Sequence, residues 1–169
     1  MNEQLQEKGY YNLSANSTQQ GKILYWQITA NNIDWLLSGV VITCSLGDHC
    51  IELTGQNTND AGQVVKSGMG SITYTLTTLP KRRYVVRFDL AGNFKCGTPA
   101  HLRVSTASDK YKDFTFDTAG KSINNMGWVR TSWEFKPGQS NYTNLTFSSL
   151  DEGTCGPIID NVVVVDVGP

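Results

Sequence analysis

The chain has 169 residues, a formal net charge of −1 and only 17% charged residues. A chain with so little net charge has no field that would attract nucleic acid or an anionic membrane, so neither is expected as a partner. No apolar run approaches the roughly 18 residues that a membrane span requires, and the length favours a single domain.

The N-terminal 22 residues are polar and lack periodicity. They predict a loosely ordered arm, with a first short strand near residues 10–14. The sequence begins without the apolar segment of a signal peptide, so either the protein stays inside the cell or Met1 replaces a signal that was removed for expression. Residues 23–169 are expected to form one β-sandwich domain.

Short apolar segments follow one another along the rest of the chain. Residues 23–29 predict a strand, and residues 33–43 predict a second, in which the apolar residues 40–42 form strand after a turn at residues 38–39. Residues 44–50 predict a tight turn, and residues 55–62 predict a loop. Further strands are predicted at 70–78, 84–91, 102–106, 111–116, 128–135, 142–148 and 158–167.

The spacing of these segments indicates the fold class. No segment of twelve residues sustains a helical apolar pattern, and residues 107–109 predict the turn of a hairpin. Eight or more short strands at a spacing of roughly ten residues are typical of an antiparallel sandwich or barrel. The sequence therefore predicts an all-β protein, an antiparallel β-sandwich.

The clearest strand runs into a glycine-rich loop at residues 92–97. Its alternation predicts one buried face, formed by Tyr84, Val86, Phe88 and Leu90. Arg87 and Asp89 lie two residues apart on the other face and are therefore neighbours on the sheet surface. Two interpretations stay open: a surface ion pair that contributes roughly 0 to 1 kcal/mol, or a polar face that binds hydroxyl groups.

The four cysteines bear on the compartment. The sequence has no C-x-x-C pair and only two histidines, which argues against a zinc site. The favoured disulfides join Cys44 to Cys50 and Cys96 to Cys155, because loop cysteines near strand ends are the easiest to bridge. The alternative is four free thiols in a cytosolic protein.

Four glycosylation sequons point towards secretion or the cell surface. A glycoprotein would carry its sugars at asparagines that precede an x-Ser/Thr pattern. These are Asn12, Asn16, Asn141 and Asn144.

Catalytic residues are not predicted. The chain has no G-x-S-x-G, no H-E-x-x-H and no phosphate loop. The histidines, His49 and His101, are interpreted as solvated side chains. The carboxylates cannot be assigned acid and nucleophile roles without geometry; the candidates are Asp89, Glu134, Asp151, Glu152 and Asp160.

Aromatic side chains suggest binding, because sugar rings stack on them while polar groups bind the hydroxyls. On the strand at 128–135, Trp133 shares a face with apolar residues and is interpreted as core. Trp128 lies on the opposite face with Arg130. The predicted ligand-binding residues are Arg87, Asp89, Asn93, Trp128 and Arg130.

Asp160 is a lone acid on an otherwise apolar face of the last strand, so it must be hydrogen-bonded, paired or bound to a metal. A carboxylate that accepts backbone N–H bonds is the favoured interpretation. The alternative is a structural Ca²⁺ held by Asp160 with Asp48 or Glu52 and backbone carbonyls. No other cofactor is predicted.

A series of ordered motifs carries a family resemblance over residues 24–166. The motifs are WQIT (26–29), IDW (33–35), IELTG (51–55), FDLAGN (88–93), LRVS (102–105), FTFDTAGKS (114–122), NMGW (125–128), LTFSSL (145–150) and CGPIIDNV (155–162). In this order they resemble the bacterial choice-of-anchor C domain and its plant cell-wall relatives of unknown function.

The resemblance implies a galactose-binding-like jelly-roll that is exported and associated with cell walls or surfaces. It implies no catalytic residues. The chain departs from the family pattern at its opening strand, where residues 12–16 stand in place of an Asn-Gly-x-Phe-Glu-like segment. Because related carbohydrate-binding modules often place calcium ligands there, the departure weakens the case for Ca²⁺.

The sequence thus predicts a secreted or cell-surface module that binds a polysaccharide or another glycan, and that is not an enzyme. Two alternatives stay open. The first is an adhesive or structural module that binds a protein partner, such as a coat or matrix component. The second, less favoured, is an enzyme acting on polysaccharide through Asp89 or Glu134.

Overall fold

The computed structural model describes residues 8–15, 23, 25–58, 63–107 and 110–169. Expectations for the other residues lie outside this description: most of the N-terminal arm, the sequon at Asn16, the end of the predicted loop at 55–62 and part of the turn at 107–109. The strands are β1 (Tyr10–Ser14), β2 (Gln27–Ala30), β3 (Asn32–Leu37), β4 (His49–Glu52), β5 (Thr54–Thr58), β6 (Val64–Met69), β7 (Ser71–Thr77), β8 (Arg83–Gly92), β9 (Ala100–Thr106), β10 (Tyr111–Phe116), β11 (Val129–Phe135), β12 (Tyr142–Ser149) and β13 (Pro157–Gly168), with one 3-10 helix, η2 (Phe94–Cys96).

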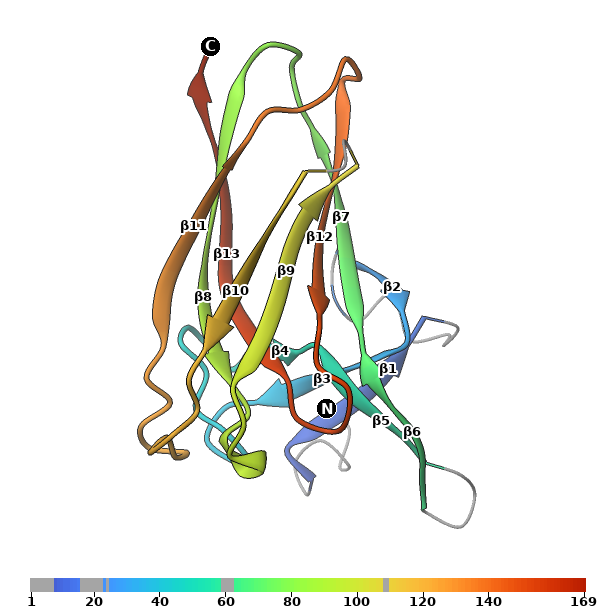
Figure 1. Ribbon diagram of the computed structural model, residues 1–169, viewed down its shortest axis with the longest axis vertical. Coiled ribbons are helices and arrows are strands. Elements are labelled where there is room, and N and C mark those ends of the chain that lie inside the picture. The colour runs from blue at the N-terminus through green and yellow to red at the C-terminus, as the bar shows by residue number, and fades with distance from the viewer. Residues whose placement is uncertain (1–7, 16–22, 24, 59–62, 108–109) are drawn as a thin grey trace.

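The strands form two packed sheets and a small hairpin, and the pairing between neighbouring strands is antiparallel (Figure 1). The six-stranded sheet has the order β1-β3-β4-β13-β8-β11. The five-stranded sheet has the order β10-β9-β12-β7-β2. Strands distant in the sequence are neighbours in both sheets, as in a jelly-roll. The predicted all-β sandwich is confirmed.

The core lies between the two sheets and is built by alternation along the strands. On β8, Val86 and Phe88 are fully buried while Arg87 is exposed, as the sequence predicts. Phe88 meets Phe147 of β12 edge to face, with ring centroids 5.1 Å apart, so one aromatic contact joins the two sheets. Aromatic pairs of this geometry contribute beyond the area that they bury.

The N-terminal strand is part of the sandwich. The short strand predicted near residues 10–14 is present as β1, which pairs with β3 at the edge of the six-stranded sheet. Leu13 of β1 is buried in the core. In the described part of the predicted arm, residues 10–14 therefore contribute both hydrogen bonds and core packing.

The prediction for residues 33–43 was wrong in its second half. The strand β3 occupies residues 32–37, before the turn, and residues 40–42 form no strand. Gly39 has a positive φ of 84° and its N–H donates to the Ile42 carbonyl over 2.7 Å, which closes a tight turn. Ile42 is buried while Val40 is exposed, so this apolar segment places one side chain in the core.

A polar hairpin was missed. Residues 55–62 were predicted as a loop, but residues 54–58 form β5, which pairs with β6 in a separate two-stranded ribbon. The strand β2 also begins at Gln27, later than predicted, because Tyr25 has a positive φ of 69°. Polar strands such as β5 lack the apolar alternation by which strands are recognised in a sequence.

Both predicted disulfides are present. Cys44 pairs with Cys50 around a short loop, and Cys96 of η2 pairs with Cys155, which lies before β13. The described chain therefore has no free cysteine. A helix long and apolar enough to cross a membrane is not found among the described residues.

Candidate functional site

The Asp89 carboxylate, predicted to face a ligand, is surrounded by protein groups. It lies on β8 opposite Arg130 of β11, whose Nη1 donates to it over 3.0 Å. Ser45 Oγ donates over 2.5 Å and Asn161 Nδ2 over 3.2 Å. Burial raises the pKa of Asp89, but the three hydrogen bonds outweigh it, so the pKa lies below its ordinary value.

These contacts attach the Cys44–Cys50 loop to the outer face of the six-stranded sheet. Ser45 reaches Asp89, and Trp128 donates its indole N–H to the Thr43 carbonyl over 2.9 Å. Asp89 is only 8% exposed as a result. Arg87, by contrast, is exposed and forms no ion pair among the described residues. The structure thus joins Asp89 to Arg130 and leaves Arg87 outside the cluster.

Asn93 belongs to a different place, a cavity of about 290 Å³ beside the Cys96–Cys155 disulfide. Its side-chain amide donates to both oxygens of Glu52, over 2.9 and 3.0 Å. The Gly156 N–H also donates to Glu52, and Asn12 donates to Asp34, which lines the same cavity. The five predicted ligand residues are therefore distributed over three environments, and their binding role stays a prediction.

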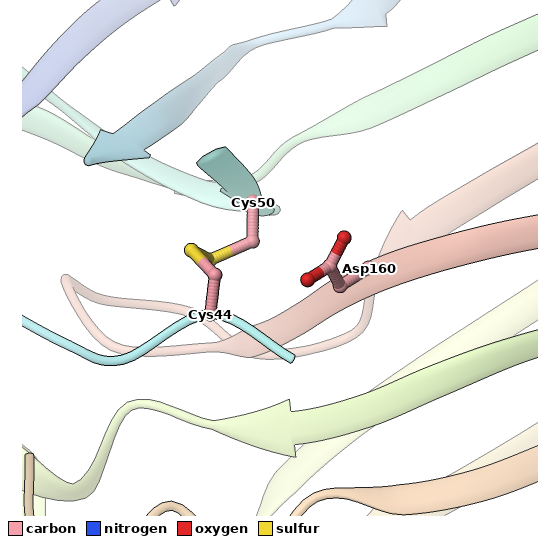
Figure 2. Close-up of side chains that lie close together, drawn as sticks. All are labelled: Cys44, Cys50 and Asp160. Atoms are coloured by element: carbon pink, nitrogen blue, oxygen red, sulfur yellow. A yellow bond between two sulfur atoms is a disulfide. The ribbon is translucent and has the colours of Figure 1, made fainter. Parts of the chain in front are cut away.

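Asp160 takes the structural role that was favoured from the sequence. Its carboxylate accepts the backbone N–H groups of Leu46 and Asn161, each over 2.7 Å. Burial raises its pKa, and these hydrogen bonds oppose the rise. Figure 2 shows this carboxylate beside the Cys44–Cys50 disulfide.

Among the described residues, one group of side chains could be considered as metal ligands: Cys44, Cys50 and Asp160 (Figure 2). Their ligand atoms all lie within 4.8 Å of one another. Both sulfur atoms are bonded to each other, and a zinc site requires thiolates. Neither Asp48 nor Glu52 joins this group. A structural Ca²⁺ held by Asp160 with backbone carbonyls stays a prediction.

A cleft of about 600 Å³ lies on the open side of the sandwich, between the edge strands β10 and β11. We call it the Trp133 cleft. Trp133 is half-buried, and its ring packs against Phe135 with centroids 5.5 Å apart. The cleft is lined by Lys110, Tyr111, Trp133, Glu134, Phe135 and Lys136.

Polar groups surround the rings of this cleft. Glu134 forms a 3.5 Å ion pair with Arg83, while neither Lys110 nor Lys136 is paired with a carboxylate in the described part of the chain. The cleft therefore offers ammonium donors beside an aromatic surface. Ligand sites in proteins combine apolar and aromatic walls with a few polar groups in this way.

The ring of Tyr111 is held from one side. The Arg103 guanidinium lies 4.1 Å from its centroid, and two hydrogen bonds of 2.7 and 2.8 Å to Asp113 fix that guanidinium. Tyr111 is nevertheless 57% exposed. Its ring is thus an oriented, accessible surface at the mouth of the cleft.

Only an indirect signal for this cleft is present in the sequence. Alternation correctly places Trp133 on the inward face of β11, where it packs against the core. The interpretation as core was incomplete, because β11 is an edge strand and its inward face reaches the open side of the sandwich. The one available signal was the run of lysines and aromatic residues at both strand ends.

A family model described as "Protein of unknown function (DUF642)" matches residues 3–165. No curated protein sequence matches the chain.

Solved structures with a similar fold include two carbohydrate-binding modules. One is TmCBM61 in complex with β-1,4-galactotriose, with a TM-score of 0.58, 14% identity, and coverage of 91% of this chain and 97% of the other. The second is the CBM22-1 xylan-binding domain from Paenibacillus barcinonensis, with a TM-score of 0.57, 11% identity and 93% coverage of both chains.

A third similar structure is an adhesin domain. It is the K1 cleaved adhesin domain of Lys-gingipain from Porphyromonas gingivalis, with a TM-score of 0.54, 12% identity, and coverage of 93% of this chain and 90% of the other. At these identities the likeness concerns the fold. The sandwich is thus an architecture found in carbohydrate-binding modules and in an adhesin.

Proposed function

Because the chain belongs to the family of proteins of unknown function DUF642, we propose its function from its own geometry: it is a non-catalytic carbohydrate-binding module that holds glycan in the Trp133 cleft. The observation that carries the proposal is the cleft itself, with two accessible aromatic rings and flanking ammonium groups. The similar fold of carbohydrate-binding modules supports it.

The chemistry of the cleft suits a sugar. A sugar ring presents an apolar C–H face, which Trp133 and Tyr111 can cover, and hydroxyl groups at its rim. Lys110, Lys136 and the Tyr111 hydroxyl can hydrogen-bond those hydroxyls. The ring of Tyr111 is already oriented by Arg103, so less side-chain freedom is lost on binding.

The same cleft argues for binding without catalysis. Glycoside hydrolysis ordinarily requires two carboxyl groups that flank the scissile bond. Among the described residues that line the cleft, Glu134 is the single carboxylate, and it is paired with Arg83. Asp89 is the other carboxylate that the sequence analysis considered for an enzyme, and it is buried and hydrogen-bonded to Ser45.

The compartment proposed is extracellular or the cell surface. Two disulfides form and persist in oxidising environments. The sequon residue Asn141 is exposed and accessible to glycosylation, whereas Asn12 is hydrogen-bonded to Asp34 and Asn32, and Asn144 accepts a hydrogen bond from Thr75. Cell-wall association and the finer likeness to the choice-of-anchor C domain belong to the same proposal.

A second candidate function is adhesion through a protein partner. The fold of the adhesin domain favours it. So does a stripe of exposed valines on the outer face of β13, formed by Val163, Val165 and Val167. Apolar side chains gathered on one surface often mark protein interaction sites.

A glycan array followed by calorimetric titration tests the proposal. We expect a polysaccharide to bind, and Trp133→Ala to abolish binding while the protein remains folded. Leu46→Ala is the matched control, since Leu46 is an exposed apolar side chain of the Cys44–Cys50 loop, outside the cleft. Binding of a protein partner without binding of any glycan would instead support the adhesive function.

A further inference from the structure

A single row of side chains crosses the outer face of the five-stranded sheet. Tyr111 of β10 lies opposite Ser105 of β9, and Ser105 lies opposite Thr146 of β12. Thr146 in turn lies opposite Thr73 of β7, and Thr73 lies opposite Gln27 of β2. We call these five residues the crossing row.

The row points away from the core. Side chains alternate along strands, so the adjacent row must point inward. On β9, β12, β7 and β2 the members of that adjacent row are buried: Val104, Phe147, Ile72 and Ile28. The crossing row is therefore the outward surface of the sheet, and it runs at right angles to the strands.

Hydroxyl groups dominate this surface, and they are held in place. The hydroxyls of Thr73 and Thr146 are 2.8 Å apart, and those of Thr29 and Thr73 are 3.0 Å apart. Next to them, Thr75 donates to the Asn144 side chain over 2.9 Å. A hydroxyl has one donor and two acceptor sites, so each retains capacity for a further hydrogen bond.

An exposed tyrosine lies at each end of the row: Tyr111 is its first member, and Tyr25 lies beside its last member, Gln27. Tyr111 at one edge also lines the Trp133 cleft. At the other edge, Tyr25 is 79% exposed and lines a groove of about 180 Å³ together with Gln27 and Thr73. The aromatic cleft and the hydroxyl surface are thus continuous through Tyr111, and a second ring lies at the far end.

The dimensions suit a chain of sugars. The row spans four strand spacings of about 4.8 Å, or about 19 Å, which exceeds the width of one ring. Charge does not interrupt the row, because Arg103 beside it is neutralised by Asp113. The surface therefore matches a linear, neutral ligand rich in hydroxyls.

We propose that the ligand is the interior of a linear polysaccharide, which runs from the Trp133 cleft over Tyr111 and along the crossing row to Tyr25. This inference rests on the proposed function and names the ligand class of the same site. A module built in this way binds several consecutive sugars and has no need of a free chain end.

Calorimetric titration with β-1,4-galactan, xylan and their oligosaccharides of two, four and six sugars tests the inference. The affinity is expected to increase with chain length until the row is filled. Thr146→Arg places a bulky side chain in the middle of the row and should weaken the binding of six sugars about tenfold or more, with little effect on two. Tyr25→Asn, which suits a positive φ, should weaken the binding of six sugars about three- to tenfold.

Thermal unfolding confirms that each variant is folded, and Leu46→Ala again serves as the control. If two sugars bind as tightly as six, and Tyr25→Asn and Thr146→Arg bind like the parent, the inference is overturned while the proposed function stands. If no polysaccharide, no oligosaccharide and no glycan of the array binds at millimolar concentration, both are overturned.

Discussion

Asp34 of β3 and Glu52 of β4 lie opposite one another in the ladder, and both carboxyl groups are buried, at 7% and 3% exposure. Burial raises the pKa of Asp34 to about 7, against a hydrogen bond from Asn12. Burial also raises the pKa of Glu52 to about 8, although Asn93 and Gly156 donate to it. Both acids line the cavity beside the Cys96–Cys155 disulfide, with Lys95 and Tyr10 facing the same space.

This pair predicts that the protein loses stability as the pH rises. A carboxyl group whose pKa is raised by folding binds more protons in the folded state than in the unfolded state. The free energy of unfolding therefore falls between about pH 4 and pH 8, as the pH passes from the ordinary pKa values of 3.8 and 4.5 to the raised ones. Thermal unfolding at intervals from pH 5 to pH 8 should show a melting temperature that falls by several degrees.

A Glu52→Gln variant isolates this effect. The glutamine oxygen can still accept from Asn93 and Gly156, so the part of the pH dependence that comes from Glu52 should disappear while the part that comes from Asp34 remains. Asp113→Asn is the matched control, because Asp113 is exposed and Arg103 lowers its pKa. A melting temperature that rises from pH 5 to pH 8 in the parent protein would refute the role of the pair.

The second prediction separates Asp89 from Arg87. Asp89→Ala removes a buried acceptor and leaves Ser45, Arg130 and Asn161 without it, so we expect a loss of about 1–3 kcal/mol. Arg87→Ala changes an exposed side chain and should stay within about 0.5 kcal/mol. Urea denaturation measures both, and equal losses would contradict the assignment of Asp89 to the loop anchor.

The third prediction concerns the disulfides. The two cysteines of the Cys44–Cys50 disulfide are 6 residues apart in the sequence, and those of the Cys96–Cys155 disulfide are 59 apart. Loop-closure entropy in the unfolded chain gives about 2 kcal/mol for the short loop and about 4 kcal/mol for the long one. Replacing Cys96 and Cys155 by serine should therefore destabilise the protein more than replacing Cys44 and Cys50. Denaturation of the two double variants gives the comparison, and the reverse order would be inconsistent with the entropic account.

The fourth prediction tests the orientation of Tyr111. Asp113→Ala frees the Arg103 guanidinium, which then holds the ring less firmly. Glycan affinity should fall about three- to tenfold while stability changes little, since the pair is exposed. Tyr111→Phe keeps the ring and should retain most of the affinity. Unchanged affinity in Asp113→Ala would show that the stacked arginine plays no part.

The fold followed from the sequence where one face of a strand is buried. The alternation of Val86, Phe88 and Leu90 located β8 and its core face, and the pairing of the four cysteines was correct. The turn at residues 40–42 was misread because a short apolar run does not distinguish a strand from a turn that places one side chain in the core. The hairpin of β5 and β6 was missed because polar strands carry no such pattern.

The candidate site could not be predicted in the same way. Arg87 and Asp89 are neighbours on one strand, but the partner of Asp89 is decided by the register between β8 and β11, which sets Arg130 opposite it. Trp133 was placed on the correct face of β11. Whether that face is covered depends on where β10 and the end of the sandwich lie, and the tertiary structure decides that.

The measurement that tests the central claim most directly is nuclear magnetic resonance of the isotopically labelled protein during titration with a bound oligosaccharide. The account predicts that the indole N–H resonance of Trp133 and the amide resonances of Tyr111 and Lys110 shift together and saturably, and that those of Arg87 and Asp89 do not. Saturable shifts confined to Arg87, Asp89 and Trp128, with Trp133 unaffected, would contradict the claim that the Trp133 cleft holds the glycan.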